Sequence, residues 1–455
     1  MWWTSKSRNK KIVIKNAKRY ELAIIKSTKI NNIIEKLQNF TMNWERNEII
    51  MNVLAIIAEY NPMHNGHVFQ INEARKKANA DFVITCMGGN FTQRGNTSIV
   101  NKFEKTKMAL VNGSDMVIEL PTIYSVSSSE NFAYGAIQIL NELKFVSHIS
   151  FGIEEENIEK LKKIASIIAK EPREYTKILK SELDLGLSYP TARAKAIVKY
   201  LNDDSYEQIL QGSNNILAIE YLKQMQIQKS KFIPIGITRN KVNYNSQNII
   251  ENYASSSAIR NLIYNNQLNK VKNVMPKSAY DILTRNIQNG TYNIDLSNYS
   301  KIIIYKLRTM KIKEIESLPD VNEGLENLIK DSANKTNNIG ELINLIKSKR
   351  YTQTRIQRIL LYTLLDITKK DIINGRKVSP YIRVLGCSKK GKELLTKIPS
   401  NKLITSLKKY EQSISNNNLE RMLEIDKNAT NIYTIPYNSN SVANLDYTMP
   451  LIVID

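Results

Sequence analysis

The stretch that most constrains the fold is a short apolar run that ends in a turn and passes directly into a helical pattern. Residues 53–58 are almost wholly apolar, which predicts a buried strand. Asn61-Pro62 breaks that strand, and apolar residues then recur at helical spacing from Val68 to Ala78. A buried strand that feeds a helix through a tight turn is the building unit of a parallel α/β sheet.

Two of the chain's three histidines lie in this turn, within the tetrapeptide His64-Asn65-Gly66-His67. They stand one turn apart at a helix start, where backbone N–H groups and the helix dipole favour phosphate. Gly66 lets the backbone come close to a ligand. A single histidine at such a place is often only a helix cap. The strand–HNGH–helix context favours nucleotide chemistry, in which the imidazoles stabilise charge at an attacked α-phosphorus.

The same strand–helix alternation continues through the first half of the chain. Further buried strands are predicted over residues 80–86, 116–120, 146–151 and 232–237. This alternation predicts a doubly wound parallel sheet over residues 51–268.

A glycine-rich turn over residues 87–95 follows the second predicted strand and carries Asn90, Gln93 and Arg94. Open α/β sheets bind ligands at the carboxyl ends of their strands, so this turn is a candidate for ligand contact. The alternative is an ordinary surface loop.

A second candidate phosphate site follows the strand at 232–237. Arg239 stands at the end of that strand, and Ser255, Ser256 and Ser257 lead into a helix whose first turn carries Arg260. A helix start with serine hydroxyls and a guanidinium suits phosphate oxygens. Viewed alone, the serines could be a simple helix cap.

From about residue 269 the patterns are mainly helical, and a short strand is predicted over 451–455. Arg350, Arg355 and Arg358 stand among tyrosines there, a mixture that suits phosphate contacts and base stacking. A solvated helix face is the alternative. We therefore predict a catalytic domain over 51–268 and a mainly α-helical domain over 269–455.

The net charge of +22 agrees with a polyanionic partner such as nucleic acid, although charge alone is weak support. Residues 1–50 carry +7 of it and differ in composition from the rest. Because Met51 comes just before the first strand, we expect translation to start there, with 1–50 either a mis-called upstream extension or a basic tail. The two cysteines have no metal-ligand spacing, and no apolar run is long enough to span a membrane, so we expect a cytoplasmic protein.

The fuller set of motifs supports a family resemblance. The segments that carry it are Ala58 to His67, Gly89 to Gly95, Glu119 to Pro121, Phe151-Gly152, Asn214 to Leu217, Arg239 and Ala254 to Arg260. Together they resemble the bacterial tRNA(Met) cytidine acetate ligase family, within the HxGH nucleotidyltransferase superfamily. The resemblance extends over about residues 51–390 and is weakest at 1–50 and after about 400.

The resemblance implies that ATP activates acetate as acetyl-adenylate and that pyrophosphate is released. The N4 amine of the wobble cytidine in the anticodon loop of elongator methionine tRNA then takes the acetyl group, giving N4-acetylcytidine and AMP. Mg²⁺ is expected to arrive with ATP rather than in a protein metal site, and no obligate protein partner is expected.

The chemistry of the motifs assigns the catalytic, phosphate and tRNA roles, and the resemblance assigns the ATP contacts. His64, His67 and Arg239 would be catalytic, Ser255, Ser256, Ser257 and Arg260 would hold phosphate, and Arg350, Arg355 and Arg358 would contact tRNA. The ATP contacts would be Ile57, Ala58, Glu59, Tyr60, Asn61, Pro62, Met63, His64, Asn65, Gly66, His67, Val68, Phe69, Gln70, Gly152, Arg239 and one of Asn214 and Asn215, with Asn215 preferred. Residues 240–246 depart from the family pattern, because a glycine expected before Tyr244 is missing.

Two other functions stay open at this point. A small-metabolite adenylyl- or cytidylyltransferase would use the same two phosphate motifs, but the long basic helical region is unusual for such enzymes. A non-catalytic RNA-binding protein with a degenerate nucleotide fold would not need the intact HNGH and serine motifs.

Overall fold

The computed structural model describes residues 51–238, 252–322, 324–438 and 442–455. Arg239, the loop 240–246 and the N-terminal residues 1–50 therefore lie outside the described residues. The chain separates into two compact units, Met1–Met51 and Asn52–Asp455, and the second contains the sheet.

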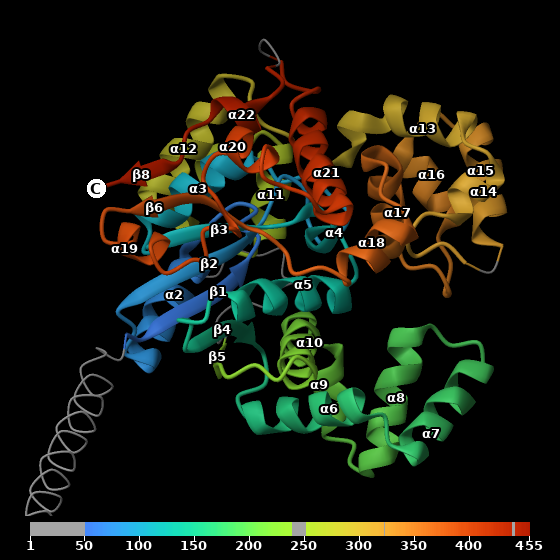
Figure 1. Ribbon diagram of the computed structural model, residues 1–455. Coiled ribbons are helices and arrows are strands. Elements are labelled where there is room, and N and C mark those ends of the chain that lie inside the picture. The colour runs from blue at the N-terminus through green and yellow to red at the C-terminus, as the bar shows by residue number, and fades with distance from the viewer. Residues whose placement is uncertain (1–50, 239–251, 323, 439–441) are drawn as a thin grey trace, which may run out of the picture. The chain divides into compact units, whose positions relative to one another are not determined.

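The centre of this unit is an eight-stranded sheet in the order β5-β4-β1-β2-β3-β6-β7, with β8 paired to β6 (Figure 1). The first five strands are parallel to one another. Their bounds are β1 (Val53–Ala58), β2 (Phe82–Gly88), β3 (Met116–Leu120), β4 (His148–Ile153) and β5 (Ile233–Thr238). All five strands predicted from the apolar runs are confirmed, each within two residues at either end.

The chain builds the sheet outward from β1 in both directions. It first adds β2 and β3 on one side and then returns to place β4 and β5 on the other. The point where the strand order reverses is the gap between β1 and β4, which is where doubly wound sheets bind ligands. The predicted doubly wound parallel sheet is therefore confirmed.

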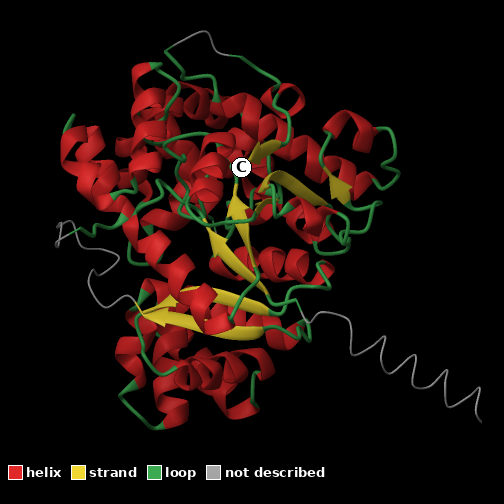
Figure 2. Ribbon diagram, turned by 90° about the vertical axis from the view of Figure 1, so that its left-hand side faces the viewer, coloured by secondary structure: helices red, strands yellow, loops and turns green. Residues whose placement is uncertain are grey.

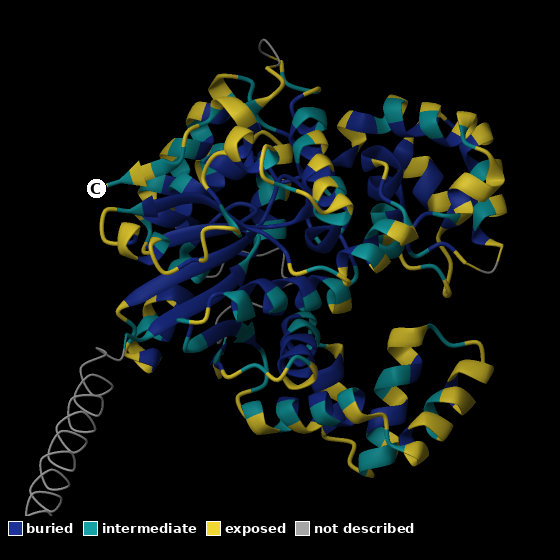
Figure 3. Cartoon of the chain, in the orientation of Figure 1, coloured by how far each residue is buried: buried dark blue, intermediate teal, exposed yellow. Residues whose placement is uncertain are grey.

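Helices cover both faces of the sheet (Figure 2). On one face, α2 (Asn65–Ala78), α3 (Lys102–Val111), α11 (Ser256–Tyr264) and α12 (Lys277–Gln288) share a core with alternate residues of β1 such as Leu54 and Ile56. Helices α5 (Ser129–Glu142) and α10 (Ser213–Ile227) pack on each other and meet β3 and β4. The central strands β1, β2 and β3 are buried, whereas exposed residues gather on the outlying helices (Figure 3).

The part of the chain after residue 268 is mainly helical, but it also adds three strands to the same sheet. β6 (Ile382–Ser388) lies antiparallel to β3 and pairs Arg383 with Glu119. β7 (Leu403–Ile404) and β8 (Ile452–Ile454) both run parallel to β6. The predicted strand at the C-terminus is thus confirmed, while β6 was not predicted. The division at residue 268 stays a prediction.

The remaining helices complete the fold. They are α4 (Thr122–Ser125), α6 (Ile158–Lys170), α7 (Arg173–Asp184), α8 (Tyr189–Leu201), α9 (Tyr206–Gln211), α13 (Ser300–Thr309), α14 (Ile312–Glu316), α15 (Leu325–Lys335), α16 (Ile339–Ile346), α17 (Gln353–Leu365), α18 (Lys369–Gly375), α19 (Lys392–Leu395), α20 (Leu407–Glu411), α21 (Asn417–Tyr433) and α22 (Leu445–Thr448), with 3-10 helices at Leu268–Val274 and Leu296–Tyr299. Within the described ranges, no helix combines the length and apolar character needed to cross a bilayer.

Candidate active site

A pocket of about 900 Å³, including its mouth, lies at the carboxyl ends of β1 and β4, where the strand order reverses. Of the predicted ATP contacts, the described residues that line it are Ile57, Ala58, Glu59, Tyr60, Asn61, His67, Gln70 and Gly152. Other residues of the stretch support the wall or face elsewhere. Met63 is fully buried, Asn65 donates to the carbonyls of Asn252 and Asn273, and Phe69 is 45% exposed.

The two histidines form a reciprocal cap at the start of α2. The Nδ1 atom of His64 accepts the Gly66 backbone N–H at 3.1 Å, and the Nδ1 atom of His67 accepts the His64 backbone N–H at 3.2 Å. Because each Nδ1 is an acceptor, each ring carries its proton on Nε2 and acts as a donor there. The rings stack with centroids 3.8 Å apart, and Tyr60 meets His67 edge-on at 4.9 Å.

The second predicted phosphate site is next to the first. Ser255 caps α11 by accepting the Ala258 N–H at 3.0 Å, and Ser256 and Arg260 line the same pocket as His67. The Nη1 atom of Arg260 donates to the Asn61 carbonyl at 2.7 Å. The N-termini of α2 and α11 and the Arg260 guanidinium therefore converge on a single pocket, an arrangement suited to a polyphosphate.

The polar residues of the glycine-rich turn lie in two places, the pocket and the core. Gln93 and Arg94 line the pocket, and the Gln93 backbone N–H donates to Oε1 of Glu59 at 2.6 Å. Asn90 is buried, where it accepts the Lys102 N–H at 2.7 Å and donates to Thr430 at 3.2 Å. Asn90 thus supports the turn from behind.

The neighbouring asparagines of α10 have different surroundings. Asn214 lines the pocket and donates to Oε1 of Glu154 at 2.6 Å. Asn215 is 2% exposed; its Oδ1 accepts the N–H groups of Glu154 and Glu155, and its Nδ2 donates to the Ile209 carbonyl. Asn215 therefore holds the loop after β4, and Asn214 is the member of the pair that faces the pocket.

A buried lysine, Lys105, holds the backbone beside the pocket in place, and the sequence did not predict it. Lys105 on α3 is fully buried, and its ammonium donates to the carbonyls of Glu59, Gly88 and Gly89 and to Ser98 Oγ at 2.6–3.0 Å. These carbonyls lie at the carboxyl ends of β1 and β2. Burial lowers the pKa of Lys105 to about 7, against the opposing effect of Glu59 and Glu119.

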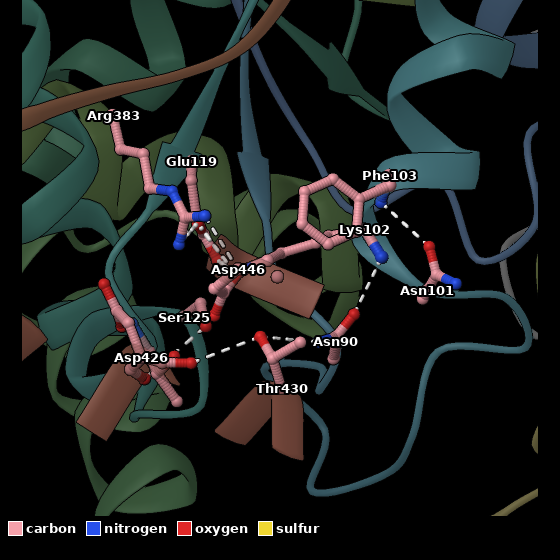
Figure 4. A network of polar contacts seen from close by, with 12 residues as sticks. Asn90, Asn101, Lys102, Phe103, Glu119, Ser125, Arg383, Asp426, Thr430 and Asp446 are labelled. Carbon is pink, nitrogen blue, oxygen red and sulfur yellow. Dashed lines mark hydrogen bonds and ion pairs between the residues drawn. The ribbon is translucent and has the colours of Figure 1, made fainter. Parts of the chain in front are cut away.

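A buried ion network behind the pocket joins the C-terminal elements to the sheet (Figure 4). Lys102 contacts Glu119 at 2.7 Å and Asp446 at 2.8 Å, and Arg383 contacts the same two carboxylates at 3.1 and 2.8 Å. Burial alone would raise the pKa of Asp446, but Arg383 and Lys102 lower it to about 2. The predicted motif Glu119-Leu-Pro121 thus supplies a structural charge.

The arginines predicted to contact tRNA are placed unequally. Arg355 donates to the Asp320 carbonyl at 2.7 Å, and Arg358 forms an ion pair with the Asp320 carboxylate at 2.9 Å. Both are half-buried on α17, whereas Arg350 is exposed, with its guanidinium 6.0 Å from the Tyr351 ring centroid. Arg355 and Arg358 therefore hold a turn, and Arg350 presents its charge at the surface.

Comparisons with known proteins agree with this geometry. Residues 51–447 match the family model described as HIGH Nucleotidyl Transferase. A tRNA(Met) cytidine acetate ligase from Caldanaerobacter subterraneus is 43% identical over 405 residues, which is 88% of this chain and all of that protein. The chain belongs to the tRNA(Met) cytidine acetate ligase family. Another member, from Acetivibrio thermocellus, is 40% identical over 89% of this chain and all of its own length.

Solved structures of the family have the same fold. Thermotoga maritima TmcAL without ligand is 29% identical and superposes with a TM-score of 0.86, over 89% of this chain and all of that one. The structure of Thermotoga maritima TmcAL with alpha-thio ATP gives a TM-score of 0.83 over the same shares. Among the residues described here, no group of three His, Cys, Asp or Glu side chains is arranged to hold a metal ion.

Proposed function

We propose that this protein is an ATP-dependent ligase that transfers acetate to the N4 amine of the wobble cytidine in elongator methionine tRNA, through acetyl-adenylate. The observation that carries the proposal is the convergence of the His67 and Ser256 helix starts on one pocket, in a chain 43% identical to a tRNA(Met) cytidine acetate ligase. Mg²⁺ would enter with the ATP phosphates.

The adenylation step needs no protein nucleophile. An acetate oxygen attacks the α-phosphorus, the bond to the β-phosphate breaks, and pyrophosphate leaves. The Nε2–H of His67 and the guanidinium of Arg260 would stabilise the charge that develops on the phosphate oxygens. Arg239, which lies outside the described residues, would act with them. The N4 amine then attacks the acetyl group and releases AMP.

Replacing the two asparagines of α10 one at a time should distinguish a residue that contacts ATP from a residue that stabilises the loop after β4. Asn214→Ala should weaken ATP binding about tenfold, because it removes a polar group from the pocket wall. Asn215→Ala should instead lower the free energy of unfolding by about 2–3 kcal/mol, because it removes the hydrogen-bond partner of the Glu154 and Glu155 N–H groups and of the buried Ile209 carbonyl. Calorimetric titration with ATP and thermal unfolding would check both. Equal effects of the two variants on ATP affinity would contradict the assignment.

Replacing the arginines near α17 should give a similar separation. Arg350→Ala should weaken tRNA binding and reduce the slope of log affinity against log salt by about 1, because one phosphate contact is lost. Arg355→Ala with Arg358→Ala should lower the unfolding midpoint, because the Asp320 turn loses its partners. An unchanged salt slope in Arg350→Ala would remove that residue from the tRNA interface.

The proposed reaction is tested by incubating the protein with bulk tRNA, ATP, Mg²⁺ and labelled acetate, followed by mass analysis of the nucleosides. Labelled N4-acetylcytidine confined to elongator methionine tRNA is the expected result. Pyrophosphate release without label in RNA would favour a small-metabolite nucleotidyltransferase. The absence of both would favour a non-catalytic RNA-binding protein.

A further inference from the structure

The transfer step requires a group that accepts a proton. As the N4 nitrogen bonds to the acetyl carbon and the carbon–oxygen bond to AMP breaks, the nitrogen must lose one of its protons. The leaving phosphate oxygen keeps the electrons of the broken bond and needs no proton at neutral pH. The proton must therefore go to the protein or to water, and a positioned base makes that transfer faster.

Most titratable groups of the pocket cannot serve as this base. The Nδ1 lone pair of His67 accepts the His64 N–H, and its Nε2 already carries a proton. Burial raises the pKa of Tyr60 to about 12 and that of Tyr221 well above its usual value, so both hydroxyls keep their protons. Arg94 and Arg260 are permanent cations.

Glu59 is the one carboxylate among the described residues that line the pocket. Glu59 directly follows β1 and precedes Tyr60, whose ring meets the ring of His67 edge-on. Its Oε1 accepts the Gln93 N–H at 2.6 Å, and its carbonyl accepts the Lys105 ammonium at 3.0 Å, so both ends of the residue are held. These contacts hold the Glu59 carboxylate in place through Oε1. Its other oxygen, Oε2, is the one that would accept a proton.

We propose that Glu59 is the general base of the transfer step and takes the proton from the attacking N4 amine. The inference rests on the proposed function and names the residue that takes up the proton in its second step, the transfer of the acetyl group. The proton would pass from the Glu59 carboxyl to solvent once the acetylated base leaves the pocket.

The charges around Glu59 agree with this role. Burial raises the pKa of its carboxyl, which strengthens the carboxylate as a base. The Gln93 N–H, Lys105 on α3, Arg94 in the glycine-rich turn and Arg260 on α11 oppose that rise and favour the ionised form. Tyr221 on α10 also faces Glu59, and burial first and then the Glu59 charge raise the pKa of its hydroxyl.

The test uses Glu59→Gln in the full chain and measures the two half-reactions separately. Acetate-dependent exchange of pyrophosphate into ATP reports adenylation, and chemically prepared acetyl-adenylate with tRNA reports transfer. Transfer should fall about 100-fold more than exchange, because the amide still accepts the Gln93 N–H but cannot take a proton. In the wild type, the transfer rate should fall at low pH as Glu59 becomes protonated. This fall should be absent in Glu59→Gln. Glu142→Gln on α5, which removes a carboxylate paired with Lys402, is the matched control.

Each result decides the inference. Equal losses in exchange and transfer, or transfer at the wild-type rate, would overturn it while leaving the proposed function intact. A wild-type protein that makes acetyl-adenylate but no acetylcytidine would overturn both. Should Glu59→Gln fail to fold, Glu59→Asp decides: slower transfer that still falls at low pH supports the base, and unchanged transfer at every pH refutes it.

Discussion

Replacing His67 by alanine is expected to lower acetate-dependent exchange of pyrophosphate into ATP by about 100- to 1000-fold, the usual cost of removing a donor that stabilises developing charge. The side chain lines the pocket, and the bond from the His64 N–H to Nδ1 fixes the proton on Nε2. Binding of tRNA should stay within about threefold of wild type, because the tRNA contacts that we propose lie on other elements.

Two further variants separate catalysis from helix capping. His67→Gln keeps a capping-box residue and an amide donor, so part of the exchange activity should return. His148→Ala, at the amino end of β4 and so at the opposite edge of the sheet, should change exchange by less than about twofold. Exchange at the wild-type rate in a folded His67→Ala protein would refute the phosphate role.

Replacing Gly95 by alanine should lower the free energy of unfolding by at least about 3 kcal/mol. Gly95 has φ +77°, and an added Cβ would stand 2.4 Å from the Gln357 carbonyl carbon and 2.5 Å from the Arg358 nitrogen. Both are backbone atoms of α17, so neither can turn aside. The turn must then move away from α17, which displaces the pocket-lining residues Gln93 and Arg94, so ATP affinity should fall together with the unfolding midpoint.

Gly186→Ala is the matched control for this change. Gly186 has nearly the same φ, +76°, but no atom lies within 4 Å of its added Cβ. It should cost only the conformational penalty, about 1–2 kcal/mol, with ATP affinity retained. If the two alanine variants unfold at the same midpoint, the close approach of Gly95 to α17 does not control stability.

The sequence predicted what depends on local pattern. The five parallel strands were recognisable because apolar runs bounded by turns specify buried strands without reference to the rest of the chain. The pocket position followed from the placement of His64 and His67 after β1, since the end of a strand fixes where the next helix begins. Their roles in catalysis remain predictions.

Tertiary partners account for what the sequence did not reveal. Lys105 resembles any solvated lysine on a helix until the carbonyls of Gly88 and Gly89 are seen around it. Asn214 and Asn215 differ by about 100° around α10, so only the packing of that helix decides which one faces the pocket. Arg355 looked available to tRNA because its partner, Asp320, lies on a distant segment.

β3 gains its neighbour β6 only late in translation, because β6 lies more than 250 residues further along the chain than β3. A ribosome that has synthesised residues 51–268 has produced the whole nucleotide pocket that we describe. At that moment β3 is still an unpaired edge, and Lys102 and Glu119 lack the counter-charges of Arg383 and Asp446. The nascent chain must keep this apolar edge from aggregating until β6 and Asp446 have emerged, and in that interval Lys102 and Glu119 have only each other as charge partners. The sheet edge and the ion network are therefore completed by residues that are synthesised well after those of the pocket.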